Sequence, residues 1–181
     1  MKLVTVSEMK AIEQQADASG LSYARMMENA GRGLAELILD LGTDNNLEEV
    51  IGLVGPGNNG GDTLVALAQL AHAGWRARAY CVKRKTKNDA LIERLVKNGG
   101  EILCAEDDDE FISLAVFIES ADVLLDGLLG TGIKLPLKAE MAAVLSAARN
   151  VLHELDAPPF IIAVDCPSGV DCDTGAAADE C

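Results

Sequence analysis

Three short segments hold most of the side chains in this chain that could do chemistry. They read VGPGNNGGDT (54–63), DGLLGTGIKLP (126–136) and VDCPSGVDCDTG (164–175). Each follows a short apolar run and combines glycines with carboxylate, amide or hydroxyl side chains. Such oxygens suit sugar hydroxyls or a hard cation, and a carboxylate can act as general acid and base. Neither histidine, His72 or His153, lies in these segments, so catalytic proton transfer would fall to a carboxylate.

The first segment partly matches two kinds of nucleotide-binding loop. The run GPGNNG (55–60) fits the dinucleotide pattern G-x-G-x-x-G, which alone is a weak signal. A hydride-transferring enzyme of that class usually has an acid after its second strand to hold the ribose. This chain has KRK at 83–85, which would suit a 2′-phosphate or form a solvated basic loop. A triphosphate-binding loop needs Lys and Ser or Thr where the chain has Gly61 and Asp62, so that class is excluded.

A structural alternative also remains for this segment. It would be a tight turn between a strand and a helix, with Asp62 as a favourable acid in the first helical turn. The two other segments weigh against it, because Asp126 and Asp165 also stand at the ends of predicted strands. Three such loops at one edge of a sheet would form a polar crevice.

The elements around these segments alternate along the chain. Two helices are predicted first, the earlier one with Ser7 as its N-cap and Gly20 at its end. The predicted helices span 8–18, 22–41, 63–74, 88–99, 109–120 and 137–155, and the predicted strands span 49–55, 76–82, 101–105, 122–130 and 159–169. This alternation predicts one doubly wound, Rossmann-like α/β domain with a mainly parallel sheet and helices on both faces, preceded by two helices. Ligands of such sheets bind at the carboxyl ends of the strands.

Composition excludes several classes of protein. The 181 residues suit one domain with a sizeable core, because 49% are hydrophobic. A net charge of −14 disfavours nucleic acid as a partner, because a phosphate backbone needs clustered basic residues. No apolar run would span a membrane, and the N-terminus lacks a signal-peptide core, so we expect a cytoplasmic protein. The five cysteines lack zinc-site spacing and are predicted to be unpaired thiols: Cys81, Cys104, Cys166, Cys172 and Cys181.

Four motifs in this order together resemble a known family. They are MMENAG (26–31), GPGNNGGD (55–62), DGLLGTG (126–132) and VDCPSGVDCDTG (164–175). The combination is similar to the YjeF N-terminal domain of NAD(P)H-hydrate epimerases. The resemblance implies an isomerase of metabolite repair, which interconverts the R and S forms of hydrated NADH and NADPH (NAD(P)HX). An S-specific, ADP- or ATP-dependent dehydratase would then restore the cofactor.

The resemblance also assigns roles to residues. Asp165 is the implied acid and base, working through loss and re-addition of the hydroxyl and a cationic ring intermediate. A potassium ion is the implied cofactor, held by Asn59, Asp126 and Ser168. The implied ligand contacts are Asn58, Asn59, Gly60, Gly61, Asp62, Gly130, Thr131, Gly132, Ile133, Lys134, Leu135, Pro136 and Asp165. Thr63 departs from the family, which usually has a glycine there, and its Cβ could narrow the backbone's approach to the ligand.

Further expectations concern the extent of the chain and its partners. The family domain continues past the DTG loop, so residues 1–181 are expected to form one domain that lacks its last strands and helix, or a following dehydratase domain. A homodimer is implied by the family alone, and preference between NADHX and NADPHX stays open. Two rival functions remain: a non-catalytic scaffold for ligand binding or dimerisation, and an ordinary NAD(P)-dependent oxidoreductase.

Overall fold

Five parallel strands form a single sheet in the computed structural model, which describes residues 3–180. The strands are β1 (Glu49–Val54), β2 (Arg76–Cys81), β3 (Glu101–Cys104), β4 (Val123–Gly127) and β5 (Phe160–Ala163). Their order in the sheet is β3-β2-β1-β4-β5. The predicted doubly wound α/β fold is therefore confirmed. Strands β4 and β5 end earlier than predicted, so more of the segments that follow them is free to form loops.

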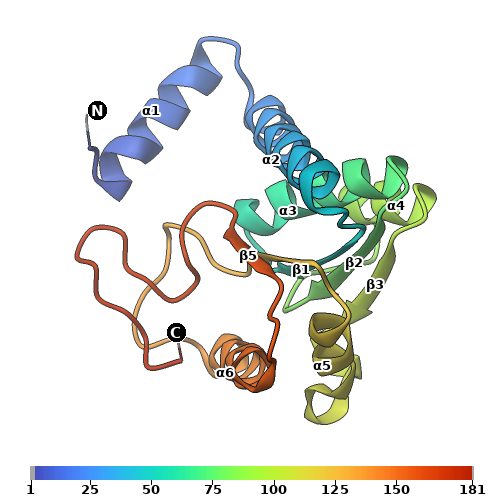
Figure 1. Cartoon of the computed structure of the whole chain (residues 1–181). Coiled ribbons are helices and arrows are strands. Elements are labelled where there is room, and N and C mark those ends of the chain that lie inside the picture. The colour runs from blue at the N-terminus through green and yellow to red at the C-terminus, as the bar shows by residue number, and fades with distance from the viewer. Residues whose placement is uncertain (1–2, 181) are drawn as a thin grey trace.

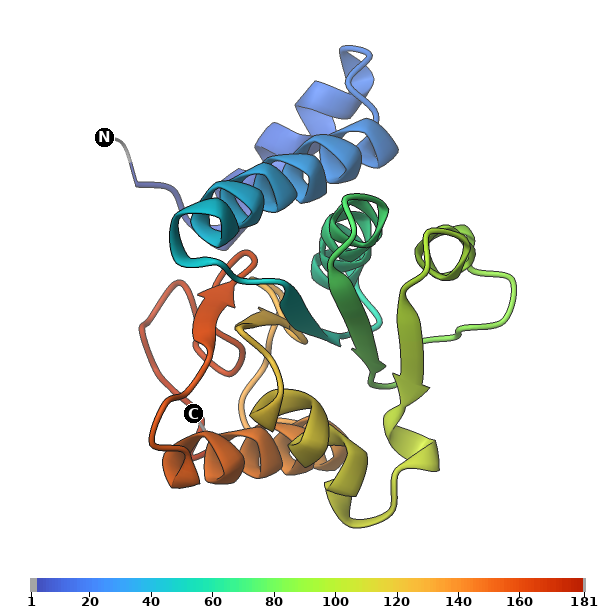
Figure 2. The same ribbon diagram turned by 45° about the vertical axis from the view of Figure 1, so that its right-hand side comes forward.

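Helices cover both faces of this sheet (Figures 1 and 2). The helices are α1 (Val6–Ala18), α2 (Tyr23–Asn45), α3 (Asn58–His72), α4 (Ala90–Lys97), α5 (Ile112–Glu119) and α6 (Ala139–Glu154), with short 3₁₀ helices at Ala105–Asp107 (η1) and Asp109–Phe111 (η2). Helices α2, α3 and α4 lie on one side of the sheet, and α5 and α6 lie on the other. Each side has its own apolar core, which includes Leu67 on the first side and Leu114 on the second. No described helix is both long and apolar enough to cross a membrane.

Helix α1 stands away from the sheet (Figure 1), and none of its residues is buried. Its N-cap is Thr5, which forms a capping box with Glu8, so the prediction of Ser7 as the cap is wrong. The reason is that the helix begins two residues earlier, and Thr5 has the glutamate three residues on that a capping box requires. Helix α1 reaches the C-terminal segment through the Val6 N–H, which donates to Asp173 Oδ1 at 2.8 Å.

The strand order places the three polar segments side by side. The chain leaves β1 toward β2 and β3, then returns to form β4 on the other side of β1, so the switch point lies between β1 and β4. In the register of the sheet Val54 pairs with Gly127, and Asp126 pairs with Ala163. The loops that follow β1, β4 and β5 therefore leave the same edge next to one another.

Candidate functional site

The first polar segment is shorter as a loop than predicted, because α3 already begins at Asn58. Its N-cap is Gly57, and no side chain caps this helix end. Glycine is needed at position 60 for close approach, because a Cβ there would collide with the Gly55 carbonyl oxygen. The first turn of α3 thus presents backbone amides at the switch point, where they favour an anionic or polar ligand.

Asn59 is buried in this first turn and points toward the loop after β4. Its Nδ2 donates to the Leu129 carbonyl oxygen at 2.7 Å. Its Oδ1 is buried and has no hydrogen-bond partner among the described residues. A buried amide oxygen without a partner is costly, so this atom is available to a ligand or ion.

Asp126, at the end of β4, is tied to the loop after β5. Ser168 donates its backbone N–H to Asp126 Oδ2 at 2.7 Å and its hydroxyl to Asp126 Oδ1 at 2.5 Å. The Ser168 hydroxyl also accepts from the Leu129 N–H at 2.8 Å. Burial raises the pKa of the Asp126 carboxyl, and the hydrogen bonds from Ser168 oppose that rise. This arrangement joins the second and third polar segments.

Asp165 follows β5 and is exposed, as a group that meets a substrate must be. Its Oδ2 accepts from the Thr131 N–H at 3.3 Å. A Cβ built on Gly130 would lie 3.1 Å from Asp165 Oδ2 and 3.3 Å from Asn59 Cβ. Gly130 therefore lies between the Asp165 carboxylate and the Asn59 side chain, and a larger residue there would crowd both. All three predicted segments meet at this point.

Asp62 lies one turn into α3, where the charges of the acids Asp165 and Glu13 act on it. Burial raises the pKa of Asp62 to about 7, and the charges of Asp165 and Glu13 add to the rise. A small cavity of about 140 Å³ adjoins Asp62 and is lined also by Tyr23 and Met26. The sequence reasoning missed Glu13, since a glutamate on an exposed helix gives no signal of the segment it will approach in the fold.

The remaining predicted contacts lie in the segment between β4 and α6. Thr131, Ile133 and Leu135 are half-buried, and Gly132, Lys134 and Pro136 are exposed. Helix α6 follows at Ala139 without a side-chain cap at its N-terminus. Two uncapped helix starts, those of α3 and α6, thus flank the same edge of the sheet.

Within the basic run after β2, Lys83 and Lys85 are exposed, as in a solvated loop, but the Arg84 side chain is only 11% exposed. Its guanidinium pairs with Asp89 at 2.8 Å and donates from Nη1 to the Gly55 carbonyl oxygen at 3.1 Å. Arg84 thereby braces the glycine segment from outside. The sequence interpretations of this run, a 2′-phosphate site or a solvated loop, did not include the contact between Arg84 and Gly55, because it joins residues 29 positions apart.

Thr63 also differs from expectation. It is fully buried, and its hydroxyl donates to the Asn59 carbonyl oxygen at 2.8 Å. Added Cβ atoms on Gly52 and Gly127 would both collide with the Thr63 side chain. Thr63 therefore faces the sheet, and the concern that its Cβ narrows the approach to a ligand is wrong.

The four described cysteines are free thiols, as predicted: Cys81, Cys104, Cys166 and Cys172. Cys181 lies outside the described residues. No group of three or more His, Cys, Asp or Glu residues within 3–180 could hold a metal ion. An ion at this edge would need the mixed amide, carboxylate and hydroxyl oxygens described above.

Such a fold defines a class: α/β proteins with a doubly wound parallel sheet, whose switch point is the usual place for a small-molecule site. Within that class the chain belongs to the family described as YjeF-related protein N-terminus, which matches residues 23–181. The chain also resembles the crystal structure of the yeast protein ynu0, with a TM-score of 0.82 over 99% of this chain and 76% of that one. At 21% identity this likeness concerns the fold.

Curated relatives carry names from cofactor repair. A Rhodopirellula baltica protein named NAD(P)H-hydrate epimerase is 36% identical over 83% of this chain and 58% of its own length. A Cenarchaeum symbiosum protein of the same name is 32% identical over 98% of this chain and 79% of its own length. A Thermofilum pendens protein named Bifunctional NAD(P)H-hydrate repair enzyme Nnr is 34% identical over 97% of this chain. This chain spans 33% of the length of that bifunctional relative.

Proposed function

We propose that this chain is an isomerase that interconverts the R and S forms of hydrated NADH and NADPH. The observation that carries the proposal is the meeting of Asn59, Gly130 and Asp165 at the switch point, in a member of this family. The names of several relatives, NAD(P)H-hydrate epimerase, support the same reaction. The reaction is metabolite repair without net redox change.

Asp165 supplies the proton chemistry in this proposal. Its carboxyl gives a proton to the hydroxyl at carbon 6 of the hydrated ring, and water leaves with both electrons of the C–O bond. Water then adds to the other face of the cationic ring and returns a proton to Asp165, so atoms and charge balance. The Thr131 N–H at 3.3 Å holds the carboxylate in place. The Asp165 carboxylate that remains after this proton transfer is negative and lies beside the ring, which stabilises the cation.

The dinucleotide is held by the two segments that begin at β1 and β4. Residues 58–62 contribute the first-turn amides of α3, and residues 130–136 lead to the uncapped start of α6. Backbone N–H groups at helix starts suit a pyrophosphate. These groups do not distinguish NADHX from NADPHX, so we propose both as substrates.

A potassium ion fits the residues at the centre of the site. Asn59 offers a buried oxygen that has no partner within residues 3–180, Asp126 a carboxylate, and Ser168 a hydroxyl. Oxygen donors with a single negative charge suit a hard monovalent cation. When bound, the ion would supply positive charge that ties the three loops together.

We further propose the setting in which the chain works. A nucleotide-dependent NAD(P)HX dehydratase would consume the S form, and the name of the bifunctional relatives supports fusion of the two activities in one chain. The sheet would continue beyond β5, whose edge leaves Phe160 and Ile161 about half exposed. We also propose that the chain acts in the cytoplasm and forms a homodimer.

The test is stereochemical. A mixture of R and S NADHX is supplied with a separate S-specific dehydratase, and NADH formation is followed with and without this protein in potassium buffer. We expect the R form to be consumed at the rate of the S form only when the protein is present. Folded protein that binds NADHX and leaves the R form untouched would point to a non-catalytic scaffold.

A further inference from the structure

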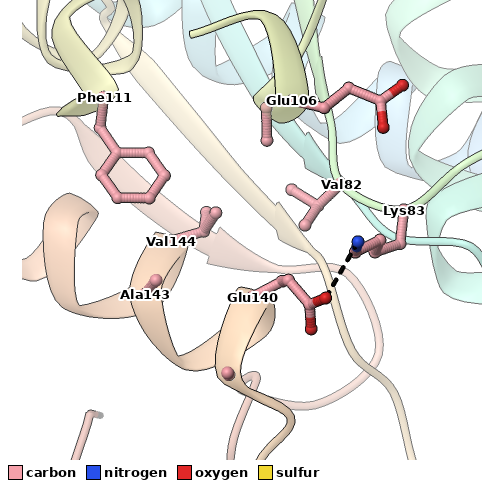
Figure 3. Close-up of a pocket in the computed structure, with 9 residues that line it drawn as sticks. Val82, Lys83, Glu106, Phe111, Glu140, Ala143 and Val144 are labelled. Carbon is pink, nitrogen blue, oxygen red and sulfur yellow. Dashed lines mark ion pairs between the residues drawn. The ribbon is translucent and has the colours of Figure 1, made fainter. Parts of the chain in front are cut away.

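A larger cavity lies outside the site described above, on the α5–α6 side of the sheet (Figure 3). We call it the β2–α6 cavity. It has a volume of about 370 Å³ and is lined by residues that follow β2 and β3 and by residues of the first turns of α6. This volume falls within the roughly 300–1,000 Å³ of small-molecule sites.

The cavity has an apolar end and a charged end. Phe111, Val144 and Ala143 gather at the apolar end, where the Phe111 ring faces the space (Figure 3). At the other end Lys83 Nζ pairs with Glu140 Oε1 at 2.9 Å. Glu106 contributes a second carboxylate to the lining. A flat, largely apolar ring that also carries an amine matches such a lining.

The backbone around the cavity is held in an uncommon conformation. Lys83, Glu110 and Phe111 have φ values of 53°, 56° and 59°. The other described non-glycine residues with positive φ are both asparagines, which adopt this conformation readily. Left-handed backbone at bulky or charged residues gathers at ligand sites, and here all three such residues lie in or next to the lining of one cavity.

Residues that line the cavity are chain neighbours of residues that contact or closely precede the two segments of the proposed dinucleotide site, 58–62 and 130–136. Lys83 precedes Arg84, which donates to the Gly55 carbonyl oxygen of the glycine segment. Ala139 and Glu140 follow closely after Pro136, the last residue of the second segment. The cavity therefore lies at the carboxyl ends of β2 and β3, the same edge of the sheet from which both segments leave.

We propose that the β2–α6 cavity receives the adenine ring of the hydrated dinucleotide. This assignment rests on the proposed function. The ring would pack against Phe111 and Val144, and its exocyclic amine would donate to Glu106 or Glu140. Lys83 at the charged end would face the ribose and phosphates. The nicotinamide end of the same molecule would then lie at Asp165. A separate adenine nucleotide could present the same ring, so the experiment distinguishes the two sources.

The first arm of the test uses Ala143→Phe, which fills the cavity from an exposed position of α6. Asn150→Phe is the control, because it adds the same ring to the same helix two turns further on, outside the lining. Epimerisation of NADHX is compared with that of its mononucleotide half, hydrated reduced nicotinamide mononucleotide. In Ala143→Phe we expect kcat/KM for NADHX, divided by kcat/KM for the mononucleotide, to fall at least about tenfold. The reason is that NADHX loses the binding energy of its adenine ring, which the mononucleotide lacks. An unchanged ratio overturns the proposal.

The second arm needs no turnover and therefore separates failure of this proposal from failure of the proposed function. Binding of AMP is measured by NMR line broadening in wild type, Ala143→Phe and Asn150→Phe. We expect binding that Ala143→Phe weakens at least about tenfold and that saturating S-NADHX displaces. Equal binding in all three proteins, or none at 10 mM (on the order of the weakest fragment affinities), overturns the assignment. AMP that stays bound with S-NADHX overturns it in favour of a separate nucleotide.

Discussion

Ser168 holds the Asp126 carboxylate with two hydrogen bonds, one from its hydroxyl at 2.5 Å and one from its backbone N–H at 2.7 Å. These bonds lock the end of β4 to the loop after β5, while the buried Asn59 Oδ1 nearby in the site keeps no partner among the described residues. The contrast suggests a site whose protein contacts are complete except for one amide oxygen. An ion at that oxygen would complete them.

The first prediction concerns this ion. Replacing choline chloride by potassium chloride at constant ionic strength should raise the free energy of unfolding by about 1.4 kcal/mol at ten times Kd, because the ion binds only the folded state. Asn59→Ala should lose this increment. Asn58→Ala, which changes the exposed neighbour, should keep it. Urea unfolding in both salts measures the increment, and equal stability of the wild type in the two salts would contradict the ion site.

The second prediction separates catalysis from folding at Asp165. Asp165→Asn should lower kcat for epimerisation at least about 100-fold, since the general acid and base is lost. The melting temperature should stay close to that of wild type, because the side chain is exposed and its hydrogen bond from the Thr131 N–H is long, at 3.3 Å. The coupled NADHX assay and thermal unfolding give the two readouts. Retained activity in the folded variant would move the proton chemistry to another carboxyl.

The third prediction uses two neighbouring glycines. Gly130→Ala should lower kcat/KM about tenfold, because the new Cβ would press on Asp165 Oδ2 at 3.1 Å and on Asn59 Cβ at 3.3 Å. Gly132→Ala is the control, since its Cβ would meet nothing within 4 Å. Steady-state kinetics of both variants decides the point. A similar loss in both would mean that chain flexibility, and not the spacing of Asn59 and Asp165, sets the rate.

The fourth prediction concerns the pH dependence of stability. The pKa of Asp62 is about 7 in the fold against an ordinary value of 3.8, so the folded state binds more protons between these values. Stability should therefore fall as pH rises from 4 to 7. Asp62→Asn should remove this loss and gain about 1–2 kcal/mol over wild type between pH 4 and pH 8, after allowance for solvent screening.

A second variant checks the cause of that shift. Glu13→Gln removes one of the two charges that raise the pKa of Asp62, and it should move the loss of stability to lower pH. Urea unfolding at several pH values measures all three proteins. A stability difference between Asp62→Asn and wild type that is the same at every pH would show that the pKa of Asp62 is the same in the folded and unfolded states.

The fifth prediction tests Arg84 as a brace of the glycine segment. Arg84→Ala should destabilise the fold by about 2–3 kcal/mol, because it leaves the partly buried Asp89 without its cation and frees the Gly55 carbonyl. Lys85→Ala, at an exposed position, should be near neutral. The preference between NADHX and NADPHX should not change in Arg84→Ala. A selective loss of NADPHX turnover would instead assign Arg84 to the 2′-phosphate.

Local pattern was enough to predict the layers of this fold and the edge that carries the site. Buried strands such as Glu49–Val54 read as apolar runs, and helices read by their period, so their alternation implied a parallel sheet. The carboxyl ends of parallel strands share one edge, which is why Asp126 and Asp165 could be placed together beforehand. The helix boundaries were less certain, as Thr5 and Asn58 show, because capping and close glycine packing shift them.

The tertiary structure alone decided which side chains support the site. In the sequence Arg84 is one of three consecutive basic residues, and only the fold shows its contact with Gly55. Thr63 was expected on the ligand side of the loop, and only the fold shows that it faces Gly127. Glu13 acts on Asp62 from a helix that precedes every strand. Sequence determined the residue types and the edge at which they gather, since period and strand direction are local properties. Contacts between distant segments depend on packing, which only the folded chain fixes.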